Sequence, residues 1–227
     1  MKLAWQQIPS TVVSDLLCNT GLDGVVLDAE HGFFNNETLY NCIQIITSLN
    51  QICLVRLTEP SKTLARACLD AGATGLIFST IETEEQCKII HEISKFPPFG
   101  GKRGLGLVRQ NKWGFGETLL PSEKPILIAQ IETVTGIKNL QTIVSYDFDY
   151  YMIGPYDLST SLGDPGNFDN PEYLKAIKNV KETISVTQMA VHVPNDVKNQ
   201  IHKYKDYAII AVGMDTTGLL EFYKELT

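Results

Sequence analysis

Residues 52–80, "ICLVRLTEPSKTLARACLDAGATGLIFST", decide the fold of this chain. Two short apolar runs, "ICLVRL" and "GLIFST", flank a helix-like segment that begins after Pro60-Ser61 and is punctuated by Gly72. Continuous apolar runs of this length are typical of strands whose two faces are both covered by helices. Start and stop residues of this kind are typical of helix ends. The stretch therefore predicts a strand–helix–strand unit of a parallel sheet.

The same alternation of apolar runs and helix-like segments continues along the chain. The other runs are "VVLD" (25–28), "PILIAQIE" (125–132), "YYMIGP" (150–155), "MAVHVP" (189–194) and "AIIAVGMD" (208–215), with "KLAWQQ" at the start as a weaker eighth candidate. Eight such units in 227 residues predict a small (β/α)8 barrel, the TIM barrel, for which about 250 residues is typical.

An open, doubly wound sheet is the alternative fold, and six clear strands would satisfy it too. No GxGxxG motif follows the first strand, which weakens the dinucleotide-binding version of that fold. The nearest glycine cluster, "GGKRGLG" (100–106), lies in a long loop. No linker or shift in composition divides the chain. We therefore predict an α/β protein with a single TIM-barrel domain over residues 1–227 and a long loop at about 96–123.

Composition excludes several classes of protein. A net charge of −7 argues against nonspecific nucleic-acid binding, which needs a basic face. No run approaches the roughly 20 apolar residues of a membrane span, and the first residues do not resemble a signal peptide. Five scattered cysteines form no CxxC pair, as expected of core residues in a reducing compartment. We expect a cytoplasmic protein with no nucleic-acid or membrane partner.

Charged and polar residues follow several of the predicted strands. In chain order these residues are Asp28, Glu30, His31, Arg56, Gln130, Glu132 and Asp157. Active sites of TIM barrels lie at the carboxyl ends of the strands. The fold would therefore bring residues from four different strands into one mouth.

Each of these residues also has a structural interpretation. Asp28 and Asp157 could cap the helices that follow them, and His31 could be a partly buried loop histidine. Arg56 and Glu132 are harder to explain in this way, because a buried unpaired charge costs several kcal/mol. For these two residues the functional interpretation is favoured.

The set suggests chemistry at a divalent cation. Glu132 and Asp157 could ligate Mg²⁺ or Mn²⁺, which take oxygen ligands and leave positions open for a chelating 2-oxo acid. The cation would stabilise an enolate, Arg56 would add positive charge, and His31 would suit proton transfer near neutral pH. A lysine that forms a Schiff base is the alternative route to such an intermediate, but none of the internal predicted strands carries a lysine.

Six separated motifs resemble the HpcH/HpaI family of class II pyruvate aldolases. They are "LDAEHG", "LVRL", "LDAGATGLI", "FPPFGGKRGLG", "QIET" and "IGPYDLS", and "VGMDT" follows near the end. The resemblance spans about residues 20–216 and implies a TIM barrel of the phosphoenolpyruvate/pyruvate superfamily. Two departures are Tyr156, where the family has a small residue, and the Phe78-Ser79 region, where a proline is usual.

The resemblance also implies catalytic roles for four residues. His31 matches the acid/base histidine and Asp28 the aspartate that assists it. Arg56 matches the arginine that faces the keto oxygen of the substrate. Asp70 matches an aspartate that family members present to the histidine of a neighbouring subunit, although from the sequence alone it is a solvated acid at a helix end.

Binding roles follow from the same resemblance. Glu132 and Asp157 match the ligands of a divalent metal, Mg²⁺ or Mn²⁺ with Co²⁺ as a further candidate. Gln130 matches a residue that lines the pyruvate site, and backbone amides around Gly154 and Pro155 are expected to hold the pyruvate carboxylate.

We therefore predict a divalent-metal-dependent class II aldolase, a carbon–carbon lyase, that acts through a metal-bound pyruvate enolate on a 2-oxo acid and an aldehyde. A homo-oligomer, a trimer or hexamer, is expected from the resemblance. One alternative is an enzyme that condenses or cleaves acyl-CoA or citrate-like substrates, for which the loop residues Lys102, Arg103, Arg109 and Lys112 could contact the CoA, unless they are simply solvated. The other is a non-catalytic barrel that binds a 2-oxo acid.

Overall fold

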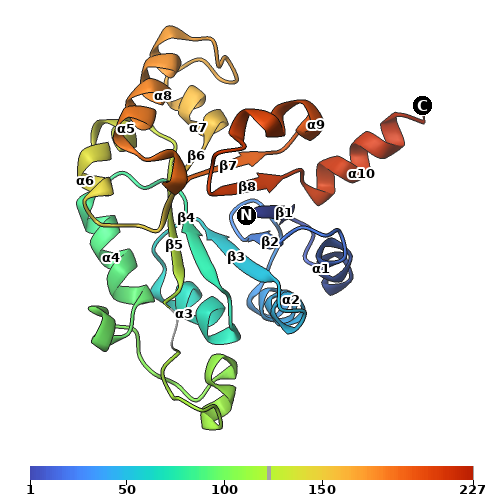
Figure 1. Cartoon of the computed structure of the whole chain (residues 1–227), viewed down its shortest axis with the longest axis vertical. Helices are drawn as coiled ribbons and strands as arrows, with labels where there is room; N and C mark the ends of the chain where they lie inside the picture. Colours follow the sequence, from blue (N-terminus) through green and yellow to red (C-terminus); the bar gives the residue numbers. More distant parts are fainter. Residues whose placement is uncertain (122–123, 227) are drawn as a thin grey trace.

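The computed structural model describes residues 1–121 and 124–226, and its strands form a closed parallel barrel (Figure 1). Each strand pairs with the next along the chain, and β8 pairs with β1. Within the described residues the strands are β1 (Lys2–Gln6), β2 (Gly24–Asp28), β3 (Ile52–Leu57), β4 (Gly75–Phe78), β5 (Ile126–Ile131), β6 (Tyr150–Ile153), β7 (Met189–Val193) and β8 (Ile209–Val212). The predicted barrel is confirmed, and the weakest candidate, "KLAWQQ", is β1.

Helices follow the strands in alternation. Within the described residues the α-helices are α1 (Thr11–Cys18), α2 (Asn36–Ser48), α3 (Lys62–Ala71), α4 (Glu84–Ser94), α5 (Val134–Lys138), α6 (Leu140–Val144), α7 (Pro155–Ser161), α8 (Pro171–Thr183), α9 (Val197–Gln200) and α10 (Asp215–Lys224). Side chains of Asn35, Ser61 and Thr83 cap α2, α3 and α4, and the cap at Ser61 agrees with the helix start expected after Pro60-Ser61. Gly72 ends α3 in a left-handed conformation with φ of 101°.

The core has two layers because successive side chains of a strand point to opposite faces. One set fills the barrel and comes from alternate strand positions such as Leu3, Val26, Leu54 and Ile128. The larger set lies between the strands and the surrounding helices. Both faces of the strands are therefore buried, which explains their unbroken apolar character.

The segment between α4 and β5 lies beside α3 (Figure 1). The predicted loop, residues 96–123, is described up to residue 121 and contains the 3₁₀ turns η1 (Pro97–Phe99) and η2 (Arg109–Gly114), while its last two residues, 122 and 123, are outside the described residues. This segment leads into the start of β5, as α3 leads into the start of β4. The segment and the carboxyl end of α3 therefore lie at the end of the barrel opposite the carboxyl ends of the strands.

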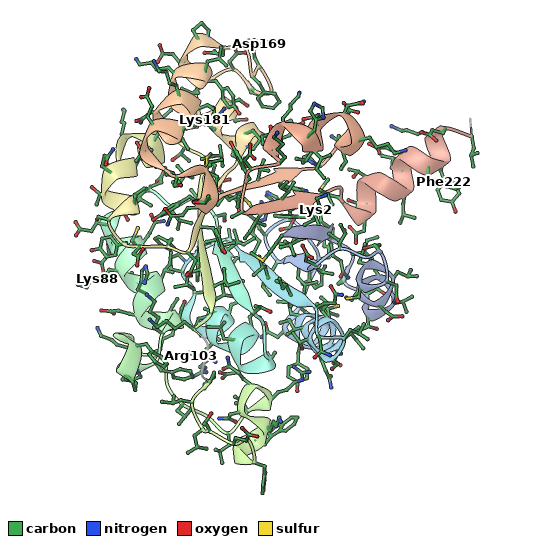
Figure 2. All side chains as sticks on the ribbon, viewed as in Figure 1. Lys2, Lys88, Arg103, Asp169, Lys181 and Phe222 are labelled. Atoms are coloured by element: carbon green, nitrogen blue, oxygen red, sulfur yellow. The ribbon has the colours of Figure 1, made fainter. Side chains whose placement is uncertain are left out.

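The last helix, α10, extends away from the barrel (Figure 1). Its start is tied to the end of β1, because Asp215 accepts hydrogen bonds from the backbone amides of Gln7 and Ile8 at 2.9 Å each. Along the described residues of this helix no side chain is buried, and Phe222, labelled in Figure 2, is 60% exposed. Among residues 1–121 and 124–226, no helix has the length and apolar character needed to cross a bilayer.

Candidate active site

An arginine–carboxylate pair closes one side of the barrel mouth. Asp28 ends β2 and lies in register with Arg56 on β3. Arg56 donates from Nε to Oδ1 of Asp28 at 2.9 Å and from Nη2 to Oδ2 at 2.8 Å. Both side chains are buried, so this two-point contact supplies the anionic partner that a buried arginine requires.

Asp28 is also a hydrogen-bond acceptor for its surroundings. Trp5 Nε1 and Gln7 Nε2 donate to Oδ2 at 3.1 and 2.9 Å. The backbone amides of Glu30 and His31 donate to Oδ1 at 3.2 Å each. Burial raises the pKa of Asp28, but Arg56 and these donors outweigh it and lower the pKa to about 2. Asp28 does not cap a helix, because α2 begins eight residues later and is capped by Asn35. It instead fixes the turn that follows β2 and stays ionised beside Arg56.

A second carboxylate holds the remaining nitrogen of the guanidinium. Glu30 Oε2 lies 3.0 Å from Nη1 of Arg56, and Ser79 Oγ donates to Oε1 of Glu30 at 2.8 Å. The guanidinium carbon lies 4.8 Å from the centre of the Trp5 ring. Arg56 is thus fixed on three sides. The sequence marked Glu30 only as a polar residue at a strand end.

The other side of the mouth carries a buried glutamate. Glu132 follows β5, and its Oε1 accepts hydrogen bonds from the backbone amide and hydroxyl of Thr80 at 2.7 and 2.9 Å. Gln130 Nε2 donates to its other oxygen. Thr80 has a left-handed backbone with φ of 53°, which aims its amide at Glu132. No pattern in the sequence marked Thr80.

Glu132 and Asp157 influence each other electrostatically. Burial raises the pKa of Glu132, and the charge of nearby Asp157 raises it further, while the Gln130 and Thr80 donors partly offset both effects. Asp157 lies in the first turn of α7, whose N-cap residue is Gly154, so Asp157 is not the cap. The Asp157 side chain is exposed and receives no hydrogen bond from the described residues.

A pocket of about 500 Å³ joins these groups at the mouth. Predicted site residues that line this pocket are His31, Arg56, Gln130, Gly154, Pro155 and Asp157. Asp28 lies behind Arg56, and Glu132 lies behind Gln130 and against Gly154, where a Cβ atom would stand 2.2 Å from Oε2 of Glu132. The backbone amide of Gly154 itself donates to Ile131 at 3.3 Å.

Two histidines face this pocket and differ in environment. His31 is exposed, and within the described residues its ring makes no hydrogen bond. His192 stacks on Trp5 with ring centres 4.0 Å apart and bonds to the carbonyl oxygen of Gly213 at 2.9 Å. Burial lowers the pKa of His192 to about 4, so that this ring is neutral at physiological pH. Trp5, on which His192 stacks, also lines the pocket.

Asp70 lies elsewhere. It stands near the carboxyl end of α3, at the barrel end opposite the pocket, where Arg103 Nη2 donates to it at 2.7 Å. Figure 2 labels Arg103, which is buried and also packs 4.4 Å from the ring centre of Phe96. Arg109 donates to the Ala71 carbonyl at 2.9 Å. Neither arginine is the solvated loop residue that the sequence allowed, and neither faces the mouth of its own barrel.

Could these residues hold a divalent cation? The carboxylate of Asp157 lies close enough to that of Glu132 for its charge to raise the pKa of Glu132. The amide oxygen of Gln130 is buried and has no hydrogen-bond partner among the described residues. Together they form an all-oxygen donor set, which suits a hard cation, and a dication would relieve the repulsion between the carboxylates. The residues present therefore fit the group.

A closed parallel barrel with charged side chains gathered at the carboxyl ends of its strands has the architecture of the (β/α)8 enzymes, whose active sites lie at that end. Comparison with known proteins narrows this class. The family model of HpcH/HpaI aldolase/citrate lyase matches residues 9–221, and the chain belongs to this family. It is accordingly an aldolase or lyase acting on carbon–carbon bonds.

Relatives and solved structures agree with this assignment. The chain is 29% identical over 220 residues to a 2-keto-3-deoxy-L-rhamnonate aldolase of Shigella boydii, covering 93% of this chain and 82% of that protein. It is 31% identical over 179 residues to the Salmonella gallinarum protein of the same name, covering 77% and 67%. The crystal structure of an HpcH/HpaI aldolase/citrate lyase family protein from Burkholderia cenocepacia superposes with a TM-score of 0.90 at 23% identity, over 100% of this chain and 92% of the other. That structure supports the fold.

Proposed function

We propose that the chain cleaves a 2-oxo acid into pyruvate and an aldehyde, and catalyses the reverse addition, with the help of a divalent cation. The observation that carries this proposal is the pocket in which Arg56, fixed by Asp28 and Glu30, faces the Gln130–Glu132–Asp157 group. Two relatives of the chain are named 2-keto-3-deoxy-L-rhamnonate aldolase, and 2-keto-3-deoxy-L-rhamnonate is a 2-oxo acid. We extend only this substrate class to the chain.

Glu132 and Asp157 would hold the cation, with Mg²⁺ or Mn²⁺ preferred for their oxygen ligands and Co²⁺ as a further candidate. When bound, the cation acts as a Lewis acid toward the carbonyl oxygen of the substrate. Thr80 holds one oxygen of Glu132 by two hydrogen bonds and thereby orients the carboxylate. A ligand oriented in this way needs little reorganisation when the ion arrives.

Arg56 places its guanidinium where negative charge develops on the keto oxygen, and Gln130 lines the same part of the pocket. In the cleavage direction His31 takes the proton of the hydroxyl group next to the bond that breaks. The electron pair of that bond passes into the 2-oxo acid as an enolate, and the hydroxyl carbon leaves as an aldehyde. A proton added to the enolate carbon then gives pyruvate. We place the pyruvate carboxylate beside Gly154 and Pro155.

Asp70 would take part through a neighbouring subunit. It lies at the barrel end opposite His31, so one copy of the chain cannot bring the two together. We propose a homo-oligomer, a trimer or hexamer, in which Asp70 of one subunit assists His31 of another. Mixing inactive His31→Ala and inactive Asp70→Asn chains should restore part of the activity, because some interfaces then combine two intact residues. A mixture as inactive as its parents would contradict this role.

We also propose a cytoplasmic location. Cys18, Cys42, Cys53, Cys68 and Cys87 are all buried and unpaired. Burial raises the pKa of each of these thiols, which keeps them protonated and unreactive. Such cysteines suit a reducing compartment.

The decisive experiment follows exchange of the pyruvate methyl protons with deuterium, because exchange requires the enolate and no aldehyde. Wild-type protein should exchange with Mg²⁺, Mn²⁺ or Co²⁺, lose this activity in EDTA and regain it with added metal. Glu132→Gln should abolish exchange, whereas the control Glu85→Gln, on the exposed side of α4, should keep it. Absence of exchange in wild type under every metal would favour a binding role, and turnover of CoA esters without aldehyde cleavage would favour the acyl-CoA alternative.

A further inference from the structure

A second cavity, of about 380 Å³, lies outside the barrel next to the active-site pocket. It occupies the space over β7 between α8 and the pair formed by α9 and the 3₁₀ turn η4 (Ile201–Tyr204), and Figure 1 shows α8 and α9 on either side of β7. Because α9 and η4 together are only eight residues long, they leave part of this face uncovered. We call this space the β7 cavity.

The β7 cavity and the active-site pocket meet at the rim of the barrel. Both are lined by Pro155 and Tyr156, which follow β6, and by Pro194 and Asn195, which follow β7. Tyr156 directly precedes Asp157, one of the two carboxylates proposed to hold the cation. A substrate whose reacting carbon lies in the pocket can therefore extend across this rim without passing through the strands.

The walls of the β7 cavity are apolar and partly aromatic. Ile177, Val180, Met189 and Val191 are among the apolar residues that line it. Phe168 contacts the Tyr156 ring edge-on, with centres 5.3 Å apart and planes at 78°. An apolar group that enters such walls gains about 25 cal/mol for each Å² removed from water.

Other lining residues of the β7 cavity are polar. Tyr173, Tyr204 and Tyr207 line it, and the rings of Tyr204 and Tyr207 are 5.2 Å apart. Burial raises the pKa of Tyr173 to about 12, and the two other tyrosines add to the effect, so the three hydroxyls lie within electrostatic reach. Within the described residues none of these hydroxyls has a hydrogen-bond partner. Lys181, labelled in Figure 2, and Lys203 add positive charge.

We propose that the β7 cavity binds the distal arm of the aldehyde part of the substrate. The walls fit an arm with an apolar, ring-sized body, and the tyrosine hydroxyls and lysines fit a hydroxyl or carboxylate at its tip. This inference rests on the proposed aldolase function and deepens it, since it names the class of aldehyde. Pyruvate does not need the β7 cavity, because its own contacts lie around Arg56 and Gln130.

The test compares aldehydes that share a reacting end and differ in the arm. With pyruvate and Mn²⁺, kcat/KM for addition is measured with propanal, hydrocinnamaldehyde and the para-hydroxy form of hydrocinnamaldehyde. Wild-type protein should prefer hydrocinnamaldehyde to propanal by roughly tenfold or more, the range that apolar pockets provide. It should prefer the para-hydroxy form further, because the tip then meets the tyrosine hydroxyls. Equal kcat/KM values for all three aldehydes would overturn the inference.

Two matched variants localise the effect. Gln200 lines the β7 cavity, whereas Lys198, on the same short helix, is exposed and does not line it. Gln200→Trp should reduce the ratio of kcat/KM between hydrocinnamaldehyde and propanal by roughly tenfold, and Lys198→Trp should leave the ratio as in wild type. Tyr204→Phe removes one hydroxyl without changing the ring, and should reduce the added preference for the para-hydroxy form. Unchanged ratios in both Gln200→Trp and Tyr204→Phe would place the arm elsewhere.

Deuterium exchange into pyruvate, measured on the same samples, separates the two proposals. Exchange without any preference among the aldehydes contradicts only the arm-binding role. Absence of exchange contradicts the aldolase function, and the arm-binding role falls with it.

Discussion

Replacement of Gly154 by alanine tests the geometry of the proposed cation site most directly. A Cβ atom at this position would stand 2.2 Å from Oε2 and 2.8 Å from Cβ of Glu132, and 3.2 Å from Nε2 of Gln130. Ordinary contacts of a Cβ atom begin at 3.4 Å, so Oε2 would have to move by at least 1.2 Å (3.4 − 2.2). The Glu132 carboxylate cannot retreat freely, because Thr80 holds its other oxygen at 2.7 and 2.9 Å.

A displacement of about 1 Å at a reacting group can cost on the order of a hundredfold in rate. We therefore expect Gly154→Ala to lower the rate of metal-dependent pyruvate exchange about a hundredfold and to weaken Mn²⁺ binding. The fold should persist, since the added methyl group meets side chains at the mouth and not the barrel core.

Exchange rates from NMR and Mn²⁺ affinity from calorimetry provide the two measurements, with circular dichroism to establish that the variant is folded. Gly218→Ala is the matched control, because a Cβ atom there meets nothing within 4 Å and the residue lies on α10. Wild-type exchange and Mn²⁺ affinity in folded Gly154→Ala would refute the placement of Glu132 at the cation site.

Three further predictions concern the charged groups. Asp28→Asn leaves Arg56 buried with Glu30 as its remaining anionic partner, and should lower the free energy of unfolding by about 3 kcal/mol, measured in urea. The pKa of Asp28 is about 2 in the folded protein, against an ordinary value of 3.8. Ionised Asp28 therefore contributes roughly 2 kcal/mol to the free energy of unfolding above pH 4, and this contribution is lost as the pH falls toward 2. Acid titration of stability should show this loss in wild type and not in Asp28→Asn. Because burial raises the pKa of Glu132 above its ordinary 4.5, protons compete with the cation sooner than at an exposed glutamate, and Mn²⁺ affinity should fall as the pH is lowered toward this raised pKa; an affinity independent of pH would contradict this.

Local patterns were sufficient to predict the barrel. Apolar runs such as 52–57 and 125–132 became β3 (Ile52–Leu57) and β5 (Ile126–Ile131), with ends shifted by no more than one residue. This success has a physical cause: strands covered on both faces must be apolar throughout, and the helices between them begin at residues whose side chains can cap them.

The sequence alone could not show how the polar residues at the strand ends are paired. Glu30 contacts Arg56 and Ser79. Thr80 donates hydrogen bonds to Glu132, which lies 52 residues further along the chain. Such pairs depend on the register between neighbouring strands and on the left-handed backbone of Thr80, which is uncommon for a residue other than glycine. Neither feature leaves a local pattern.

The sequence by itself determined the class of fold, the apolar core and the residue types available at the mouth, because burial and capping act on each segment separately. Only the tertiary structure decided that Arg56 is held by two carboxylates, that Asp70 lies at the far end beside Arg103, and that a cavity opens over β7. The physical reason is distance along the chain: these arrangements join residues that meet only after the barrel has closed.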